Sequence, residues 1–148
     1  MKNKYPTPTK YKPKHPEKYK GDVNNIWSRS SWEWKFLRWC DNNPNVLEYS
    51  SEETVIPYIC ATDQKTHRYF IDFKIKVRNK SGEIKTYLVE VKPKKQTIPP
   101  VKPKRKTKYY LEEVMTYAKN MSKWQYASAY CKDRGYIFRI ITEDDLGL

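Results

Sequence analysis

The chain has 148 residues, with 30 lysines and arginines against 17 acids and a net charge of +13. This length suits one domain and is too short for two domains with separate cores. The charge favours a polyanionic partner such as nucleic acid, and no apolar run reaches the roughly 18 residues of a membrane-spanning helix. We expect a soluble protein made inside a cell, without a secretion signal, a membrane partner or a small-molecule substrate.

The basic charge is concentrated in two segments. Residues 1–20 hold seven lysines and one acid, and residues 92–108 hold eight basic residues and no acid. The rest of the chain is close to neutral. Because the first segment offers little apolar surface to bury, it predicts an extended or disordered tail over 1–21, followed by a folded domain over 22–148.

The first helix is expected over residues 28–43, with Ser28 or Ser30 as its cap and an Asn-Pro pair as its stop. Glu33 leads an apolar stripe with i, i+3, i+4, i+7 spacing, followed by Phe36, Leu37 and Cys40. An acid in this place either complements the helix dipole or points into a site where helix meets sheet. The spacing alone favours the dipole.

Several extended segments follow the helix. Residues 46–49 and 54–59 predict two short strands, and Pro57 places the second near a sheet edge. The clearest alternation covers residues 69–77, which predict one continuous strand with Asp72 on its more polar face. Its apolar face would carry Tyr69, Ile71, Phe73, Ile75 and Val77.

A second strand, over residues 84–92, should form a hairpin with the first. If residues 80–82 are a three-residue loop, Gly82 falls at the left-handed position that such loops need. The resulting register sets Asp72 opposite Glu90, where Cβ atoms are about 5 Å apart on the same face.

Two carboxylates this close repel each other unless a cation lies between them. They predict a seat for Mg²⁺, a hard ion bound by carboxylates, phosphate oxygens and water, with Mn²⁺ able to replace it. Lys92 lies two residues beyond Glu90 on the same face, where its ammonium could hold the attacking water. The alternative is a surface salt bridge, since an acid followed at a distance by Glu-x-Lys arises often by chance.

The C-terminal part predicts two helices, over residues 109–121 and 123–134, with Gly135 as the stop, and then a strand over 136–141. Strands followed by helices and a returning strand indicate an α/β fold with a mixed central sheet flanked by α-helices. The three cysteines show no metal-ligand spacing and are expected as buried free thiols: Cys40, Cys60 and Cys131.

Five motifs occur in a characteristic order: Arg29-Ser30-Ser31-Trp32-Glu33, Ser51-Glu52-Glu53 with Ile56-Pro57-Tyr58, the run from His67 to Phe73, Val89-Glu90-Val91-Lys92-Pro93, and Gln96-Thr97 through Pro99-Pro100. Over about residues 22–145 they resemble the head-completion nuclease family of T-even-like bacteriophages, within the PD-(D/E)xK superfamily. That family is similar to the endonuclease subunit of the Tn7-type transposase. Their order is more specific than any single motif.

The resemblance implies a restriction-endonuclease-like fold and Mg²⁺-dependent cleavage of DNA. It also shifts Glu33 from a dipole partner to an active-site acid. The implied catalytic residues are Glu33, Asp72, Glu90 and Lys92, with the three acids as metal ligands. One departure is Ile71, which stands where the class commonly has proline; this position shapes the backbone and does not bind metal.

DNA contacts are expected from basic residues near these motifs and from the second basic segment. The set is Arg29, His67, Arg68, Lys94, Lys95, Lys102, Lys104, Arg105, Lys106 and Lys108. A surface role for His67 is an equal alternative. Lysines interleaved with tyrosines also suit residues 1–20 to phosphate contact and base stacking, against the alternative of a solvated tail.

The expected function is endonuclease cleavage of double-stranded or branched phage DNA, or of its ends, during head completion. The expected location is the host cytoplasm, with association with the virion as a further possibility. The expected protein partners are phage portal or head proteins. The alternative is a non-catalytic DNA-binding head-completion protein that keeps the nuclease fold. A general RNA binder ranks third, because no RNP-like aromatic strand is present.

Overall fold

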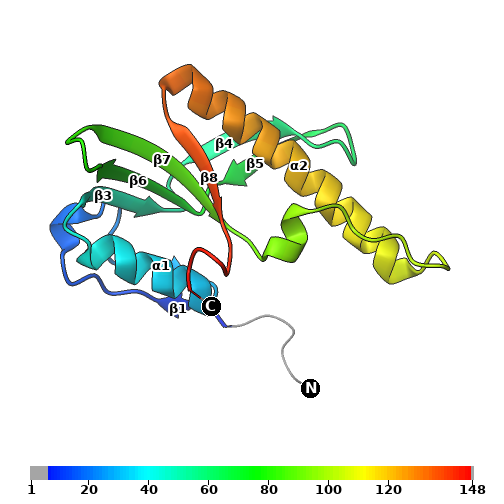
Figure 1. Ribbon diagram of the computed structural model, residues 1–148, viewed down its shortest axis with the longest axis horizontal. Coiled ribbons are helices and arrows are strands. Elements are labelled where there is room, and N and C mark those ends of the chain that lie inside the picture. The colour runs from blue at the N-terminus through cyan, green and yellow to red at the C-terminus, as the bar shows by residue number, and fades with distance from the viewer. Residues whose placement is uncertain (1–6, 148) are drawn as a thin grey trace.

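The computed structural model describes residues 7–147, which form a mixed β-sheet with one helix on each face (Figure 1). In the main sheet the strand order is β3-β6-β7-β8; β7 and β8 run parallel, and the other neighbours are antiparallel. The predicted α/β fold with a mixed sheet is confirmed. The elements are β1 (Thr9–Lys10), the 3-10 helix η1 (Pro16–Lys18), β2 (Trp27–Ser28), α1 (Ser31–Asn42), β3 (Val46–Ser51), β4 (Val55–Ile59), β5 (Thr66–Phe70), β6 (Phe73–Arg78), β7 (Ile84–Val91), the 3-10 helix η2 (Lys94–Thr97), α2 (Lys108–Arg134) and β8 (Ile137–Ile141).

Apolar side chains fill both layers between sheet and helix. The predicted stripe of α1 packs against alternate residues of β3, β6 and β7, including Phe73 and Val89. On the opposite face, Leu88 of β7 meets α2 and the small β4–β5 sheet. The odd and even residues of β7 therefore serve different cores. All three cysteines are free and buried, as predicted: Cys40, Cys60 and Cys131.

The strand predicted over residues 69–77 is in fact two strands in different sheets, so this prediction is wrong. β5 ends at Phe70 and pairs with β4, whereas β6 begins at Phe73 and lies between β3 and β7. As a result Tyr69 and Ile71 pack in the core on the α2 side, not on the α1 side with the β6 residues.

The backbone changes partners at this break. The Ile71 N–H donates to the Thr54 carbonyl at 3.0 Å, and the Asp72 carbonyl accepts from the Glu52 N–H at 3.1 Å. Both bonds join the connection between β5 and β6 to the connection between β3 and β4. Each of these connections leads from one sheet to the other. Asp72 therefore lies at the seam where the small sheet meets the main sheet.

The two predicted C-terminal helices are a single helix, α2, with 27 residues. No proline or glycine interrupts residues 108–134. The Ser122 hydroxyl donates to the Ala118 carbonyl at 3.1 Å and accepts from the Ala61 N–H at 3.0 Å, so its polar group is satisfied inside a continuous helix. The helix ends at Gly135, which has a φ of +71° as the predicted stop requires. No described helix is long and apolar enough to cross a membrane.

Residues 11–20 belong to the domain, so the predicted boundary at residue 21 is wrong for them. Tyr11 and Tyr19 are buried in the core beside α1, and β1 pairs with β2. The two tyrosines supply the apolar surface that a count of aliphatic residues missed. Residues 1–6 of the predicted tail lie outside the described part of the chain.

Hydrogen bonds also hold residues 11–20 against the C-terminal end of α1. The buried Asp41 carboxylate accepts hydrogen bonds from the Lys14 and His15 N–H groups, at 2.7 and 3.0 Å, and from the Tyr11 hydroxyl at 3.2 Å. Lys18 Nζ donates to three carbonyls at the C-terminus of α1, those of Cys40, Asp41 and Asn43, at 2.7–2.9 Å. These bonds satisfy carbonyls that the helix itself leaves without partners.

The predicted register of the β6–β7 hairpin is confirmed. The pairs run from Arg78 with Ile84 to Phe73 with Val89. At the turn the Gly82 N–H donates to the Asn79 carbonyl at 3.0 Å, and Gly82 has a φ of +82°.

This conformation makes Gly82 a sensitive position. Replacing it with valine should lower the free energy of unfolding by roughly 1–3 kcal/mol, since a β-branched residue is strained at positive φ. Ser81→Ala is the matched control and should change stability by less than about 0.5 kcal/mol. Urea denaturation of the three proteins measures both effects, and equal midpoints would contradict the assigned loop conformation.

Candidate active site

Asp72 and Glu90 meet at the seam between the two sheets. The β6–β7 ladder ends at Phe73 with Val89, one step short of the predicted pair of Asp72 with Glu90. In place of a ladder bond, the Asp72 side chain reaches the neighbouring strand, where its Oδ2 atom accepts from the Val91 N–H at 2.9 Å. The break after β5 therefore turns the Asp72 carboxylate toward β7, beside Glu90.

The environment of these acids favours their neutral forms. Burial is the largest cause that raises the pKa of Asp72 well above its usual range, and the charges of Glu90 and Glu33 raise it further. The Val91 N–H and Lys92 act in the opposite direction. Burial also raises the pKa of Glu90, against the stabilising effects of its hydroxyl and lysine neighbours. The charges of Glu90 and Glu33 therefore both act on Asp72.

Glu33 is the third acid of this cluster, and it comes from α1, whereas Asp72 lies just before β6 and Glu90 lies in β7. Ser30 caps α1 by accepting a hydrogen bond from the Glu33 N–H at 3.1 Å, which places Glu33 in the first turn. Its Oε1 atom accepts from the Arg29 N–H at 3.3 Å. Burial raises its pKa, and the charges of Glu52 and Glu90 add to that rise. Glu33 therefore has both properties that its sequence position suggested, a first-turn place in the helix and proximity to the other acids.

Lys92 follows β7 and lies beside the acids. Its Nζ atom is 3.6 Å from Glu90 Oε1, and its side chain is 27% exposed, so it is open to a substrate. Its backbone N–H donates to the Ile141 carbonyl of β8 at 2.9 Å. The parallel strand therefore fixes the backbone from which Lys92 projects.

Two further residues complete the surroundings of Glu90. The Tyr69 hydroxyl donates to Glu90 Oε2 at 2.6 Å, and Lys123 Nζ of α2 lies 5.4 Å from the centre of the Tyr69 ring. Burial lowers the pKa of Lys123, as does the nearby charge of Lys92, while Glu90 and Asp72 oppose the shift. Lys123 is thus a second lysine at the acid cluster.

Sequence reasoning missed both of these residues. The assumed continuous strand put Tyr69 on the wrong face. The sequence could have predicted Lys123. It lies between Asn120 and Ala127 on the buried stripe of α2, and a lysine in such a place needs a charged or polar partner.

The predicted DNA contacts are not gathered in one place. Arg29 forms a two-pronged ion pair with Glu52, at 2.7 and 3.1 Å. His67 pairs with Asp63 at 2.7 Å, and Arg68 lies over the Phe70 ring. Lys94 contacts Asp144 at 3.1 Å. The remaining basic residues are exposed along the segment that leads from the acid cluster to α2: Lys95, Lys102, Lys104, Arg105, Lys106 and Lys108.

Oxygen is the ligand type that this cluster offers to a metal ion. Asp72 Oδ2 and Glu90 Oε2 already accept hydrogen bonds, which leaves Asp72 Oδ1 and Glu90 Oε1 as the oxygens without a hydrogen-bond donor among the described residues. No group of three or more histidines, cysteines or acids within residues 7–147 is arranged closely enough to hold an ion by itself. Asp72 and Glu90 thus each offer one carboxylate oxygen without a hydrogen-bond donor, and Glu33 is a third acid whose charge acts on Asp72.

The family model named TnsA-like endonuclease N terminal matches residues 43–143, a range that contains Asp72, Glu90 and Lys92 but begins after Glu33. A relative, the head completion nuclease of Enterobacteria phage T4, is 43% identical over 141 residues; the match covers 93% of this chain and 91% of the relative. No solved structure matches the chain significantly. The chain therefore belongs to the TnsA-like endonuclease family and has its restriction-endonuclease-like fold.

Proposed function

We propose that this chain is a Mg²⁺-dependent endonuclease that hydrolyses phosphodiester bonds in DNA. The observation that supports this most is the cluster of Asp72, Glu90 and Glu33 beside Lys92, in which burial raises the pKa of all three acids and the charges of Glu90 and Glu33 raise that of Asp72 further. A purely structural role does not account for three acids placed together where each is costly to ionise.

The donor set fits a small hard cation. Asp72 and Glu90 would hold Mg²⁺, or Mn²⁺ in its place, through their carboxylates, and Glu33 would do so through water. This agrees with the two carboxylates, phosphate oxygens and waters that Mg²⁺ commonly takes in nucleotide-processing sites. A bound divalent cation would supply Lewis-acid polarisation of the scissile phosphate.

The side chains have distinct parts in the hydrolysis. Lys92 holds the attacking water near the acids; as the water oxygen bonds to phosphorus and gives up a proton to solvent, the bond from phosphorus to the leaving sugar oxygen breaks and that oxygen takes up a proton. Tyr69 fixes one oxygen of Glu90, so that the other stays directed at the site. Lys123 adds positive charge where negative charge builds up on the phosphoryl oxygens.

The relative at 43% identity carries the name head completion nuclease, and this supports a biological setting. We propose that the chain cleaves phage DNA, at ends or branches, during head completion in the host cytoplasm. Portal or head proteins would then be its protein partners. The basic segment at residues 94–108 would hold the phosphate backbone of the substrate.

A cleavage assay tests the proposed reaction. Supercoiled plasmid, linear duplex and branched oligonucleotides are incubated with the full chain in Mg²⁺, in Mn²⁺ and in EDTA. Cleavage is expected with either metal and is expected to stop with EDTA. If cleavage survives exhaustive chelation, the metal-dependent mechanism is wrong; if DNA is bound but never cut, the chain is a DNA-holding protein that keeps the nuclease fold.

The acid cluster should also affect stability in the absence of metal. Groups whose pKa is raised by folding favour the folded state below their ordinary pKa, and this contribution is lost as the pH rises through the raised value. The metal-free protein should therefore lose stability from the ordinary carboxyl pKa upward. Asp72→Asn should flatten this dependence and raise the metal-free Tm at neutral pH, by about 2–4 °C for each kcal/mol of relieved repulsion.

Asparagine keeps an oxygen that can accept the Val91 N–H, so this variant changes charge with little change of shape. Thermal unfolding with EDTA and with Mg²⁺ measures the effect. Mg²⁺ should stabilise the parent much more than the variant. A variant that is less stable than the parent without metal would contradict the raised pKa of Asp72.

A further inference from the structure

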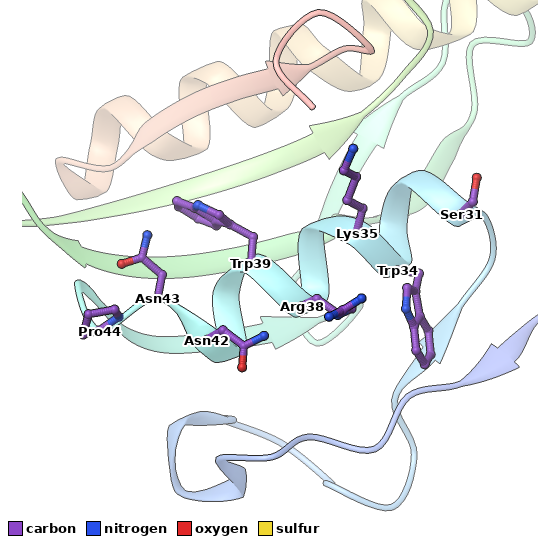
Figure 2. A pocket seen from close by; sticks show the side chains of 8 residues that line it. All are labelled: Ser31, Trp34, Lys35, Arg38, Trp39, Asn42, Asn43 and Pro44. Atoms are coloured by element: carbon purple, nitrogen blue, oxygen red, sulfur yellow. The ribbon is translucent and has the colours of Figure 1, made fainter. Parts of the chain in front are cut away.

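A hollow of about 810 Å³ lies along α1 (Figure 2). It is lined by residues other than the buried stripe of α1 that Glu33 leads. Nothing in the proposed cleavage reaction uses it. Two tryptophans, two cations and two asparagine side chains shape it: Trp34, Trp39, Lys35, Arg38, Asn42 and Asn43.

Other aromatic rings hold both tryptophans in place. Trp34 meets Tyr11 edge-on, with ring centres 4.9 Å apart, and Trp39 lies 5.7 Å from the buried Phe36. Even so, Trp39 is 46% exposed, which is unusual for the largest apolar side chain. Rings that are fixed and open to solvent can stack on a ligand with little further loss of conformational freedom.

The charge of the hollow has one sign. Lys35 and Arg38 are its ionisable residues, and Arg38 follows Lys35 by three positions, close to one helical turn. Neither forms an ion pair with a carboxylate anywhere in residues 7–147. Along α1, Arg38 lies between the two tryptophans (Figure 2). Cations without a carboxylate partner, beside the exposed Trp39 and the half-buried Trp34, suit a ligand that is both aromatic and anionic.

We propose that this hollow binds single-stranded DNA. Unpaired bases present flat faces to the tryptophans, and the phosphates between them meet Lys35 and Arg38. A duplex satisfies only the cations, because its base faces are stacked inside the helix. The asparagine amides can contact base edges that are exposed in an unpaired strand.

The hollow and the acid cluster share α1. Because an α-helix is about 10–12 Å across with its side chains, a strand that passes round the helix from one face to the other needs only a few nucleotides. An unpaired strand that leaves the site near Glu33 could therefore reach the hollow. The binding itself needs no cleavage, so it holds or fails independently of the proposed function.

Binding measured in EDTA tests the site. The probe is a fluorescently labelled twelve-nucleotide oligothymidine, compared with a duplex of mixed sequence and equal length, by anisotropy. Trp39→Ala should weaken single-strand binding by about fivefold or more, while duplex binding stays within about twofold. Arg38→Ala should weaken single-strand binding and lower its log–log salt slope by about 0.7.

The controls are Trp39→Phe, which keeps a stacking ring, and Arg78→Ala, which removes an exposed arginine at the far end of the hairpin. Both should bind the single strand nearly like the parent. An oligonucleotide with 5-iodouracil should also form a photo-crosslink to a tryptic peptide that begins at Trp39 or contains Trp34. Unchanged single-strand affinity in Trp39→Ala and Arg38→Ala, or crosslinks confined to other peptides, would overturn the proposal in favour of a protein-binding face.

Discussion

Replacing Lys92 with alanine is expected to lower the single-turnover cleavage rate about 100-fold or more and to leave DNA affinity almost unchanged. Lys92 Nζ forms an ion pair with Glu90 Oε1 at 3.6 Å, and the other hydrogens of its ammonium could hold the attacking water. Such a group acts on the transition state more than on the bound substrate. Rates at saturating DNA and binding isotherms separate the two effects.

Three variants make this result specific. Asp72→Asn should resemble Lys92→Ala in rate, because it removes the charge of a proposed metal ligand. Lys123→Ala should also lower the rate, whereas Lys119→Ala, an exposed lysine on the same helix, should not. If Lys92→Ala and Asp72→Asn both cleave like the parent, the cluster is only an ion pair, and the DNA-holding alternative becomes the better description.

Removing residues 1–20 is expected to prevent the domain from folding. The deletion takes away two buried tyrosines and leaves the Asp41 carboxylate without three of its donors. A buried charge without partners costs several kcal/mol, and a domain has only about 5–15 kcal/mol to lose. Circular dichroism and thermal unfolding of the truncated chain measure the outcome.

A matched pair of point variants separates packing from charge in this segment. Tyr11→Ala should cost about 3–5 kcal/mol, because Tyr11 is buried and bonded to Asp41. Lys12→Ala removes an exposed lysine next to it and should change stability by less than about 0.5 kcal/mol. A truncated chain that melts like the parent would show that these contacts contribute nothing to the fold.

The local parts of the fold could be predicted because neighbouring residues determine them. A three-residue loop with Gly82 allows one register, and that register carries Asp72 to within one step of a pair with Glu90. The helix cap at Ser30 and the stop at Gly135 follow from backbone groups within a few positions. Of the four proposed catalytic residues, Asp72, Glu90 and Lys92 came from this local pattern.

The remaining features depend on partners that are distant in the sequence. Residues 69–77 alternate like one strand, and the break at Ile71-Asp72 is visible only once Thr54 and Glu52 supply competing hydrogen bonds. The burial of the basic N-terminal segment likewise depends on Asp41, 20 or more positions away. Local alternation and composition carry no record of such contacts.

For Glu33, the local sequence pattern and the family resemblance predicted different roles. Spacing alone favoured a dipole partner, and the family resemblance moved it to the active site. Its electrostatic coupling to Glu90 and Asp72 supports the second reading, while its place in the first turn of α1 keeps the first one true as well. The sequence could not separate these roles because one side chain is placed for both.

Not all of the net charge of +13 is available to a partner, because Lys18 is bonded within the domain. An ammonium group has three hydrogens, and Lys18 donates to three carbonyls at the end of α1. In the native protein this amine should resist acylating reagents that modify exposed lysines such as Lys12 and Lys20, and it should become reactive only on unfolding. The extent of labelling at each lysine would then measure whether the N-terminal segment is bound to the end of α1.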